Sequence, residues 1–178
     1  MTICAILLDL PAENAPDRSR VRRIALAALA ALCRPVVVPG DRRLREELCG
    51  LPIDVIDDTS MAAALETALT IAPHLDGAIL LRPDQPNVNA MTISRLCSTF
   101  RTACAAIVAS EYDQTIGLPA LFGRSVLGDL LALPPGTDPK RVIAEQAPKL
   151  FTVAVPEASR QIDSMEEYAL LQHGMDVA

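Results

Sequence analysis

Short apolar runs rich in β-forming residues alternate with longer helix-forming segments along the whole chain. The runs at residues 2–10 and 35–40 flank an Ala- and Leu-rich segment, residues 21–33, whose composition predicts a helix. A strand–helix–strand unit in a compact chain usually forms a parallel strand pair with a right-handed crossover. The N-terminal part of the chain therefore favours a parallel sheet with helices packed on it.

The same alternation continues towards the C-terminus. We expect strands at 53–56, 77–82, 105–110, 117–122 and 150–155, and helices at 41–49, 60–72, 89–103, 125–133, 139–147 and 164–172. The run at 77–82 is fully apolar, which is typical of a central strand covered on both faces. Pro119 lies within the run at 117–122 and suits an edge or an irregular strand. The pattern predicts a three-layer α/β/α, Rossmann-like domain with a mostly parallel mixed sheet.

Composition limits the class of protein further. The 178 residues suit a single domain, residues 1–178, and the scarcity of aromatic residues, 3%, means that Ala, Leu, Val and Ile must fill its core. A net charge of -6 and so few aromatic side chains disfavour a nucleic-acid-binding surface. Neither a signal peptide nor an apolar stretch of about 18 residues is present, so we expect a cytoplasmic protein with no membrane segment.

The cysteines and several arginines have simple structural interpretations. The five cysteines, Cys4, Cys33, Cys49, Cys97 and Cys104, form no C-x-x-C pair and are interpreted as small buried residues in a reducing compartment. The arginines Arg22, Arg23, Arg42, Arg43 and Arg45 are interpreted as solvated helix faces. Ser60 is placed to cap the helix predicted at 60–72.

Two acidic residues lie beside predicted elements where a ligand would bind. In an open α/β sheet the ligand crevice lies beyond the carboxyl ends of the strands. Asp84 follows the strand at 77–82, and Asp163 precedes the last helix. Two such acids could hold Mg²⁺ together with a phosphate. Local alternatives remain open, because Asp84 could simply form a turn and Asp163 could cap the helix.

Three motifs together resemble a known family. They are Asp84-Gln85-Pro86 after an apolar strand, Gly117-Leu118-Pro119-Ala120-Leu121-Phe122 after a short loop, and Asp163-Ser164-Met165-Glu166 at the last helix. In this order and spacing they resemble the molybdenum-cofactor nucleotidyltransferases. The molybdopterin cytidylyltransferase branch, which has the nucleotide-diphospho-sugar transferase fold, is the most similar type. The resemblance covers residues 75–172 well and 35–72 loosely.

The resemblance implies transfer of a nucleotide from CTP, GTP or a related triphosphate to the terminal phosphate of a pterin, with release of pyrophosphate. It implies that Asp84 and Asp163 are the catalytic residues and the ligands of one Mg²⁺ ion. It also implies ligand-binding roles for Ser60, Gln85, Pro86 and Gly117, while Arg18 and Arg20 would supply positive charge to the triphosphate.

The N-terminal loop departs from the family pattern. Family members have a glycine-rich loop after the first strand, and a lysine follows it; glycine lets backbone N–H groups surround phosphates. This chain has no glycine before Gly40 and no lysine before Lys140, and Asp9 and Glu13 lie in the loop. An alternative function is therefore a non-catalytic protein of the same fold that binds a pterin-type cofactor or associates with a molybdoenzyme.

Overall fold

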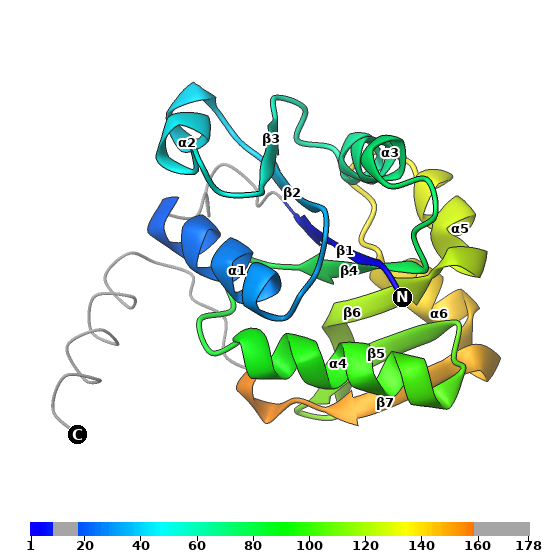
Figure 1. Ribbon diagram of the computed structural model, residues 1–178. Helices are drawn as coiled ribbons and strands as arrows, with labels where there is room; N and C mark the ends of the chain where they lie inside the picture. The colour runs from blue at the N-terminus through cyan, green and yellow to red at the C-terminus, as the bar shows by residue number, and fades with distance from the viewer. Residues whose placement is uncertain (9–17, 159–178) are drawn as a thin grey trace, which may run out of the picture.

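The computed structural model describes residues 1–8 and 18–158, and the strands in these ranges join one sheet (Figure 1). The strands are β1 (Ile3–Leu7), β2 (Val36–Pro39), β3 (Asp54–Ile56), β4 (Gly77–Leu81), β5 (Ile107–Tyr112), β6 (Thr115–Gly123) and β7 (Leu150–Ala154). Their order across the sheet is β3-β2-β1-β4-β6-β5-β7. The strand pairs β1–β2, β1–β4, β2–β3 and β5–β7 are parallel, and β6 is antiparallel to both of its neighbours. The predicted mixed, mostly parallel sheet is confirmed.

Strand β6 lies inside the sheet, so the prediction of an edge strand at 117–122 is wrong. The prediction of irregularity is confirmed, because the pairing with β5 shifts register between Ala109 and Ser110. Leu118 and Pro119 fall in this shift, between the pairs Ser110↔Gly117 and Ala109↔Ala120. The Ser110 hydroxyl donates to the Pro119 carbonyl at 2.6 Å. The bulge thus accommodates a residue that has no N–H to donate to the ladder.

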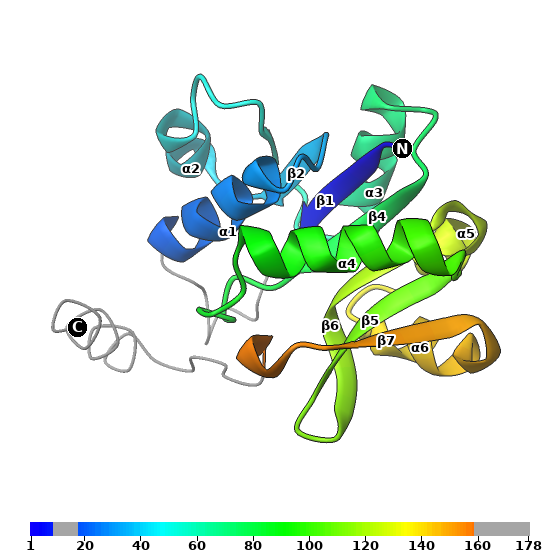
Figure 2. The same cartoon turned by 60° about the horizontal axis from the view of Figure 1, so that its bottom comes forward.

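Helices cover both faces of the sheet (Figures 1 and 2). They are α1 (Arg18–Ala30), α2 (Arg42–Glu47), α3 (Met61–Ile71), α4 (Ala90–Ala103), α5 (Leu127–Leu131) and α6 (Lys140–Glu145). One hydrophobic cluster joins the sheet to α1, α2 and α4, and a second joins it to α3, α5 and α6. No helix in the described part of the chain has both the length and the apolar content of a membrane span. The helix predicted at 164–172 lies outside the described residues.

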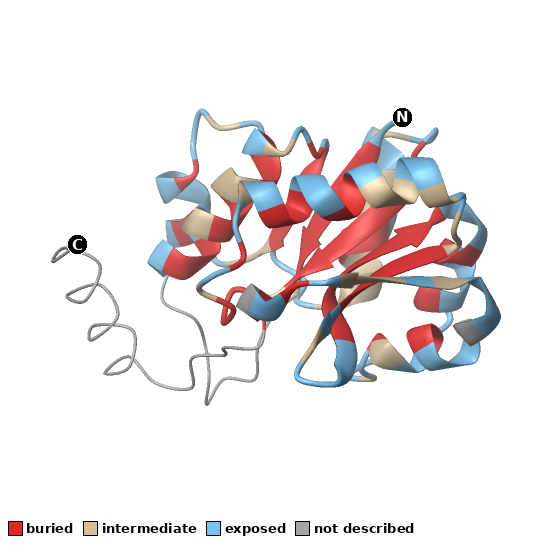
Figure 3. Cartoon of the chain, turned by 90° about the horizontal axis from the view of Figure 1, so that it is seen from below, coloured by how far each residue is buried: buried red, intermediate tan, exposed pale blue. Residues whose placement is uncertain are grey.

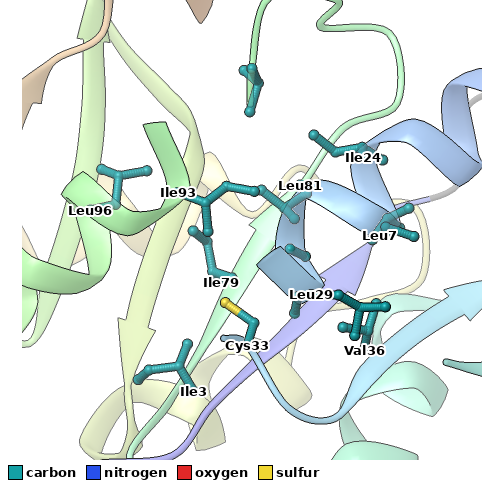
Figure 4. Close-up of a cluster of buried hydrophobic side chains, with 14 of the residues drawn as sticks. Ile3, Leu7, Ile24, Leu29, Cys33, Val36, Ile79, Leu81, Ile93 and Leu96 are labelled. Carbon is teal, nitrogen blue, oxygen red and sulfur yellow. The ribbon is translucent and has the colours of Figure 1, made fainter. Parts of the chain in front are cut away.

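The central strands are buried (Figure 3), and their alternate residues enter the two clusters. In β4, Ile79 and Leu81 face α1 and α4, whereas Ala78 and Leu80 belong to the opposite cluster. Figure 4 shows Ile79 and Leu81 among aliphatic side chains that include Ile24 and Ile93. This confirms that β4 is a central strand covered on both faces.

Three cysteines are buried and two are exposed. Cys4, Cys33 and Cys97 belong to the core, as predicted, and Cys33 is visible in Figure 4. The prediction that all five are buried is wrong for Cys49 and Cys104. Cys49 follows α2, and Cys104 ends α4 in a left-handed conformation with φ 50°. Both adjoin apolar sequence, but the chain turns at the end of a helix and leaves them at the surface.

Candidate functional site

An open cavity of about 460 Å³ lies at the carboxyl ends of the parallel strands β1, β3 and β4. Its lining residues come from five parts of the fold: Leu8 after β1, Thr59–Ala62 at the start of α3, Arg82 after β4, Leu118 in β6, and Leu133–Pro139 between α5 and α6. We call this cavity the crevice. It occupies the position at which open α/β sheets bind their ligands.

Asp84 lies in a tight turn directly after β4. The Gln85 N–H donates to the Arg82 carbonyl at 3.4 Å, and Pro83 occupies the second position of this turn, which its fixed φ favours. Only 4% of Asp84 is exposed. The turn-forming interpretation therefore describes the backbone correctly, but it leaves the role of the carboxylate open.

The Asp84 carboxylate accepts hydrogen bonds from the guanidinium of Arg82. Arg82 Nε lies 3.0 Å from Oδ1, and Nη2 lies 2.5 Å from Oδ2. Such a bidentate ion pair is among the strongest polar contacts in proteins. Burial by itself would lower the pKa of the Arg82 guanidinium, but its bonds to Asp84 and the nearby charges of Asp84 and Asp138 raise that pKa above its ordinary value.

Arg82, Tyr112 and Asp138 are site residues that sequence reasoning missed. Burial raises the pKa of the Tyr112 hydroxyl, and the charges of Arg82, Asp84 and Asp138 also act on it. Asp138 lines the crevice from the loop before α6. The spacing Arg-Pro-Asp was a usable signal for Arg82, because a proline turn brings the flanking side chains together.

The described residues do not fit an open site for a divalent metal ion. Both carboxylate oxygens of Asp84 already accept from Arg82. Within residues 1–8 and 18–158, no group of three or more His, Cys, Asp or Glu side chains could hold a metal ion. Asp163, the second expected ligand, lies outside the described residues.

Gln85 anchors the turn to the rest of the fold. Its side chain is fully buried, and Nε2 donates to the carbonyls of Leu118 at 2.9 Å and Ala158 at 3.1 Å. Pro86, which is partly buried, occupies the second position of a second turn, in which the Val88 N–H donates to the Gln85 carbonyl at 3.4 Å. Gln85 therefore places Asp84 relative to β6.

Arg23 clamps the same loop from α1. Its Nη1 donates to the Val88 carbonyl and its Nη2 to the Gln85 carbonyl, each at 2.9 Å. The interpretation of Arg23 as a solvated residue is wrong, because the side chain spans the gap between helix and loop and is partly buried. The charge pattern of the sequence does not predict the two backbone carbonyls to which Arg23 donates.

Ser60 and Gly117 lie at or beside the crevice. The Ser60 hydroxyl oxygen accepts from the Ala63 N–H at 3.1 Å, so the predicted N-cap is confirmed, and Ser60 also lines the cavity. Gly117 precedes Leu118 in β6. A Cβ at Gly117 would lie 2.9 Å from both Lys140 Cε and the Tyr112 hydroxyl oxygen, so the absence of a side chain lets these two residues approach the strand.

The two arginines proposed to meet the triphosphate lie on α1. Arg18 pairs with Asp41, the N-cap of α2, at 3.3 Å, and Arg20 is buried, with 4% of its surface exposed. Neither is among the residues that line the crevice. Their proposed contact with a nucleotide remains a prediction.

The strand order and the crevice at the carboxyl ends define the nucleotide-diphospho-sugar transferase fold. Residues 16–150 match the family described as the MobA-like NTP transferase domain, and the chain belongs to this family of nucleotidyltransferases. No curated protein matches the sequence.

Several solved structures share the fold at low sequence identity. Rv0371c from Mycobacterium tuberculosis H37Rv has a TM-score of 0.72 at 21% identity, covering 97% of this chain and 98% of that chain. Its complex with manganese gives a TM-score of 0.70 at 22% identity, with 97% and 99% covered. CMP:2-keto-3-deoxy-manno-octonic acid synthetase complexed with CTP gives a TM-score of 0.69 at 12% identity, with 99% of each chain covered.

Proposed function

We propose that the crevice binds CTP or GTP and that the protein transfers the nucleotide to the terminal phosphate of a pterin. The observation that carries this proposal is the crevice itself, because its lining joins Arg82, just before the Asp84-Gln85-Pro86 motif, and Leu118, within the motif at 117–122, to the start of α3. Its volume of about 460 Å³ falls within the range of small-molecule sites. Family membership supports the transfer of a nucleotide.

The residues of the crevice divide into apolar and polar parts. Leu8, Met61 and Leu118 offer apolar surface to a base. The N-terminus of the 11-residue helix α3 carries partial positive charge, which favours a phosphate group. Lys140, whose side chain lies beside Gly117, offers a cation to the acceptor phosphate.

The reaction proposed is a substitution at phosphorus. An oxygen of the acceptor phosphate forms a bond to the α-phosphorus, and the bond from that phosphorus to the pyrophosphate breaks. Such a reaction depends on positioning and on stabilisation of charge rather than on covalent catalysis. The CTP complex of the synthetase and the manganese complex of Rv0371c support a nucleotide and a divalent cation as ligands of this fold.

Pyrophosphate release tests the transfer. The folded protein is incubated with CTP or GTP, Mg²⁺ and reduced molybdopterin, and pyrophosphate is measured against a reaction without acceptor. We expect acceptor-dependent release with one of the nucleotides, and its reduction in Asp84→Ala. If neither nucleotide gives release above the acceptor-free level, the transfer proposal is wrong.

A second candidate is a non-catalytic protein of the same fold that binds a pterin-type cofactor or associates with a molybdoenzyme. The pairing of both Asp84 oxygens with Arg82 favours it. It predicts that molybdopterin binds in a calorimetric titration, that CTP and GTP stabilise the protein little against heat, and that no pyrophosphate is released. Acceptor-dependent release would exclude it.

A further inference from the structure

We propose that Arg82 is an internal cation that occupies the Asp84 carboxylate in place of a divalent metal ion. A metal could then bind this carboxylate only by displacing the guanidinium. The inference rests on the proposed function in one respect, because it takes Asp84 as the carboxylate that a metal would use.

The first support is the geometry of the pair. The two nitrogen atoms of Arg82 reach separate oxygens of Asp84, at 3.0 and 2.5 Å. The planar fork of an arginine matches a carboxylate in this way, whereas the point charge of a lysine does not. Both oxygens that would coordinate a metal therefore already accept from a cation.

The second support is access. The Asp84 side chain is only 5% exposed, while that of Arg82 is 27% exposed and lines the crevice. Of the two side chains, the guanidinium is therefore the one that lines the cavity, and Asp84 is not among the lining residues. A cation that enters the crevice meets a positive charge before it meets Asp84.

The third support is the permanence of the charge. An arginine side chain stays protonated in proteins, so Arg82 cannot leave Asp84 by losing a proton. Asp138 adds a second negative charge near Arg82. Asp84 thus holds the guanidinium by direct bonds, and the charge of Asp138 favours it there, at the end of β4, where the resemblance implies a metal ion.

Removal of the guanidinium is expected to create a metal site. Mn²⁺ alone, without nucleotide, is titrated into the full chain, and free Mn²⁺ is followed by electron paramagnetic resonance. In the wild type, Mn²⁺ must break the strong hydrogen bonds between Arg82 and Asp84 before it can bind, and in Arg82→Leu these bonds are absent. We therefore expect Arg82→Leu to bind Mn²⁺ roughly tenfold or more tightly than the wild type. The double variant Arg82→Leu, Asp84→Asn is expected to lose this gain.

A matched control frees a carboxylate elsewhere. Arg45 pairs with Asp57 at 2.8 Å on the surface, away from the crevice. Arg45→Leu should leave Mn²⁺ binding unchanged, since the Asp57 carboxylate that it frees is 79% exposed and already hydrated by water. Circular dichroism checks the fold of each variant, and Arg82→Gln carries the same expectation if Arg82→Leu does not fold.

Two results would overturn the inference. One is wild-type Mn²⁺ binding as tight as that of the Arg82 variant, and the other is a gain that persists when Asp84 is also replaced. The titration contains no nucleotide, so it is independent of the calorimetric and pyrophosphate assays. A failure of the proposed function would appear in those assays, and a failure of this inference would appear in the Mn²⁺ titration.

Discussion

The guanidinium of Arg82 bonds both carboxylate oxygens of Asp84 across a single proline, in the turn that ends the central strand β4. Because the Asp84 side chain is only 5% exposed, this pair replaces contacts that water would otherwise provide. The pair therefore contributes to the stability of the turn as well as to the charge of the crevice.

Asp84→Ala is expected to destabilise the protein. The substitution leaves the partly buried Arg82 without its acceptor, and hydrogen bonds to charged groups contribute about 1.5–3 kcal/mol. We expect the free energy of unfolding, measured by urea titration, to fall by about that amount. Asp57→Ala is the control, because it breaks an exposed pair with Arg45 and should cost less than about 1 kcal/mol. Equal losses in the two variants would contradict this account of the buried pair.

Gln85→Ala is expected to destabilise the loop that carries Asp84. It removes the donor that serves the buried carbonyls of Leu118 and Ala158. A buried acceptor without a partner costs about 1–3 kcal/mol, so we expect a loss of roughly 2–3 kcal/mol in urea unfolding. Gln146→Ala breaks an exposed bond to Asp129 and should change stability by less than about 0.5 kcal/mol. A Gln85 variant as stable as the wild type would show that the loop does not depend on this amide.

The thiols provide a test of the packing. Burial raises the pKa of Cys4 to about 12. Cys33 and Cys97 are free thiols joined by a hydrogen bond. This hydrogen bond and burial raise the pKa of the Cys33 thiol, while the same hydrogen bond lowers the pKa of the Cys97 thiol. Because all three are buried, we expect only the exposed Cys49 and Cys104 to react rapidly with a disulfide reagent in the native protein.

The count of reactive thiols checks this prediction. Cys49→Ser, Cys104→Ser should abolish the fast reaction, and all five thiols of the wild type should react in guanidinium chloride. A third thiol that reacts as fast as the exposed pair would show that the core opens more readily than its burial indicates.

Much of the fold followed from the sequence because each buried parallel strand must be an apolar run of its own. The place of β6 did not follow, since Pro119 argued for an edge and the bulge that admits it depends on Ser110 of a neighbouring strand. The turn between β5 and β6 was also hidden, because Asp113 and Gln114 adopt φ values of 48° and 58° without the glycine that usually marks such a turn.

The candidate site could be predicted from the sequence only in part, because some of its residues come from segments that are distant along the chain. Asp84 was found because it ends a recognisable strand, and its motif has a fixed order with the others. Asp138 joins the crevice from a loop far along the chain, and no local pattern indicates that approach. The spacing of Arg82 and Asp84 across Pro83 indicated that the two side chains lie near each other, but it did not show that both carboxylate oxygens are paired.

Ala62 offers the most direct test that the crevice is the nucleotide site. It lies in the first turn of α3 and lines the cavity, and its methyl group leaves open volume in front of the helix N-terminus. Ala62→Phe would fill part of that volume. We expect the affinity for CTP or GTP, measured by calorimetry, to fall roughly tenfold or more, equivalent to about 1.4 kcal/mol. Ala144→Phe adds the same group at an exposed position of α6 outside the lining and should leave nucleotide affinity unchanged. If Ala62→Phe folds normally and binds the nucleotide as the wild type does, the nucleotide binds elsewhere on the protein.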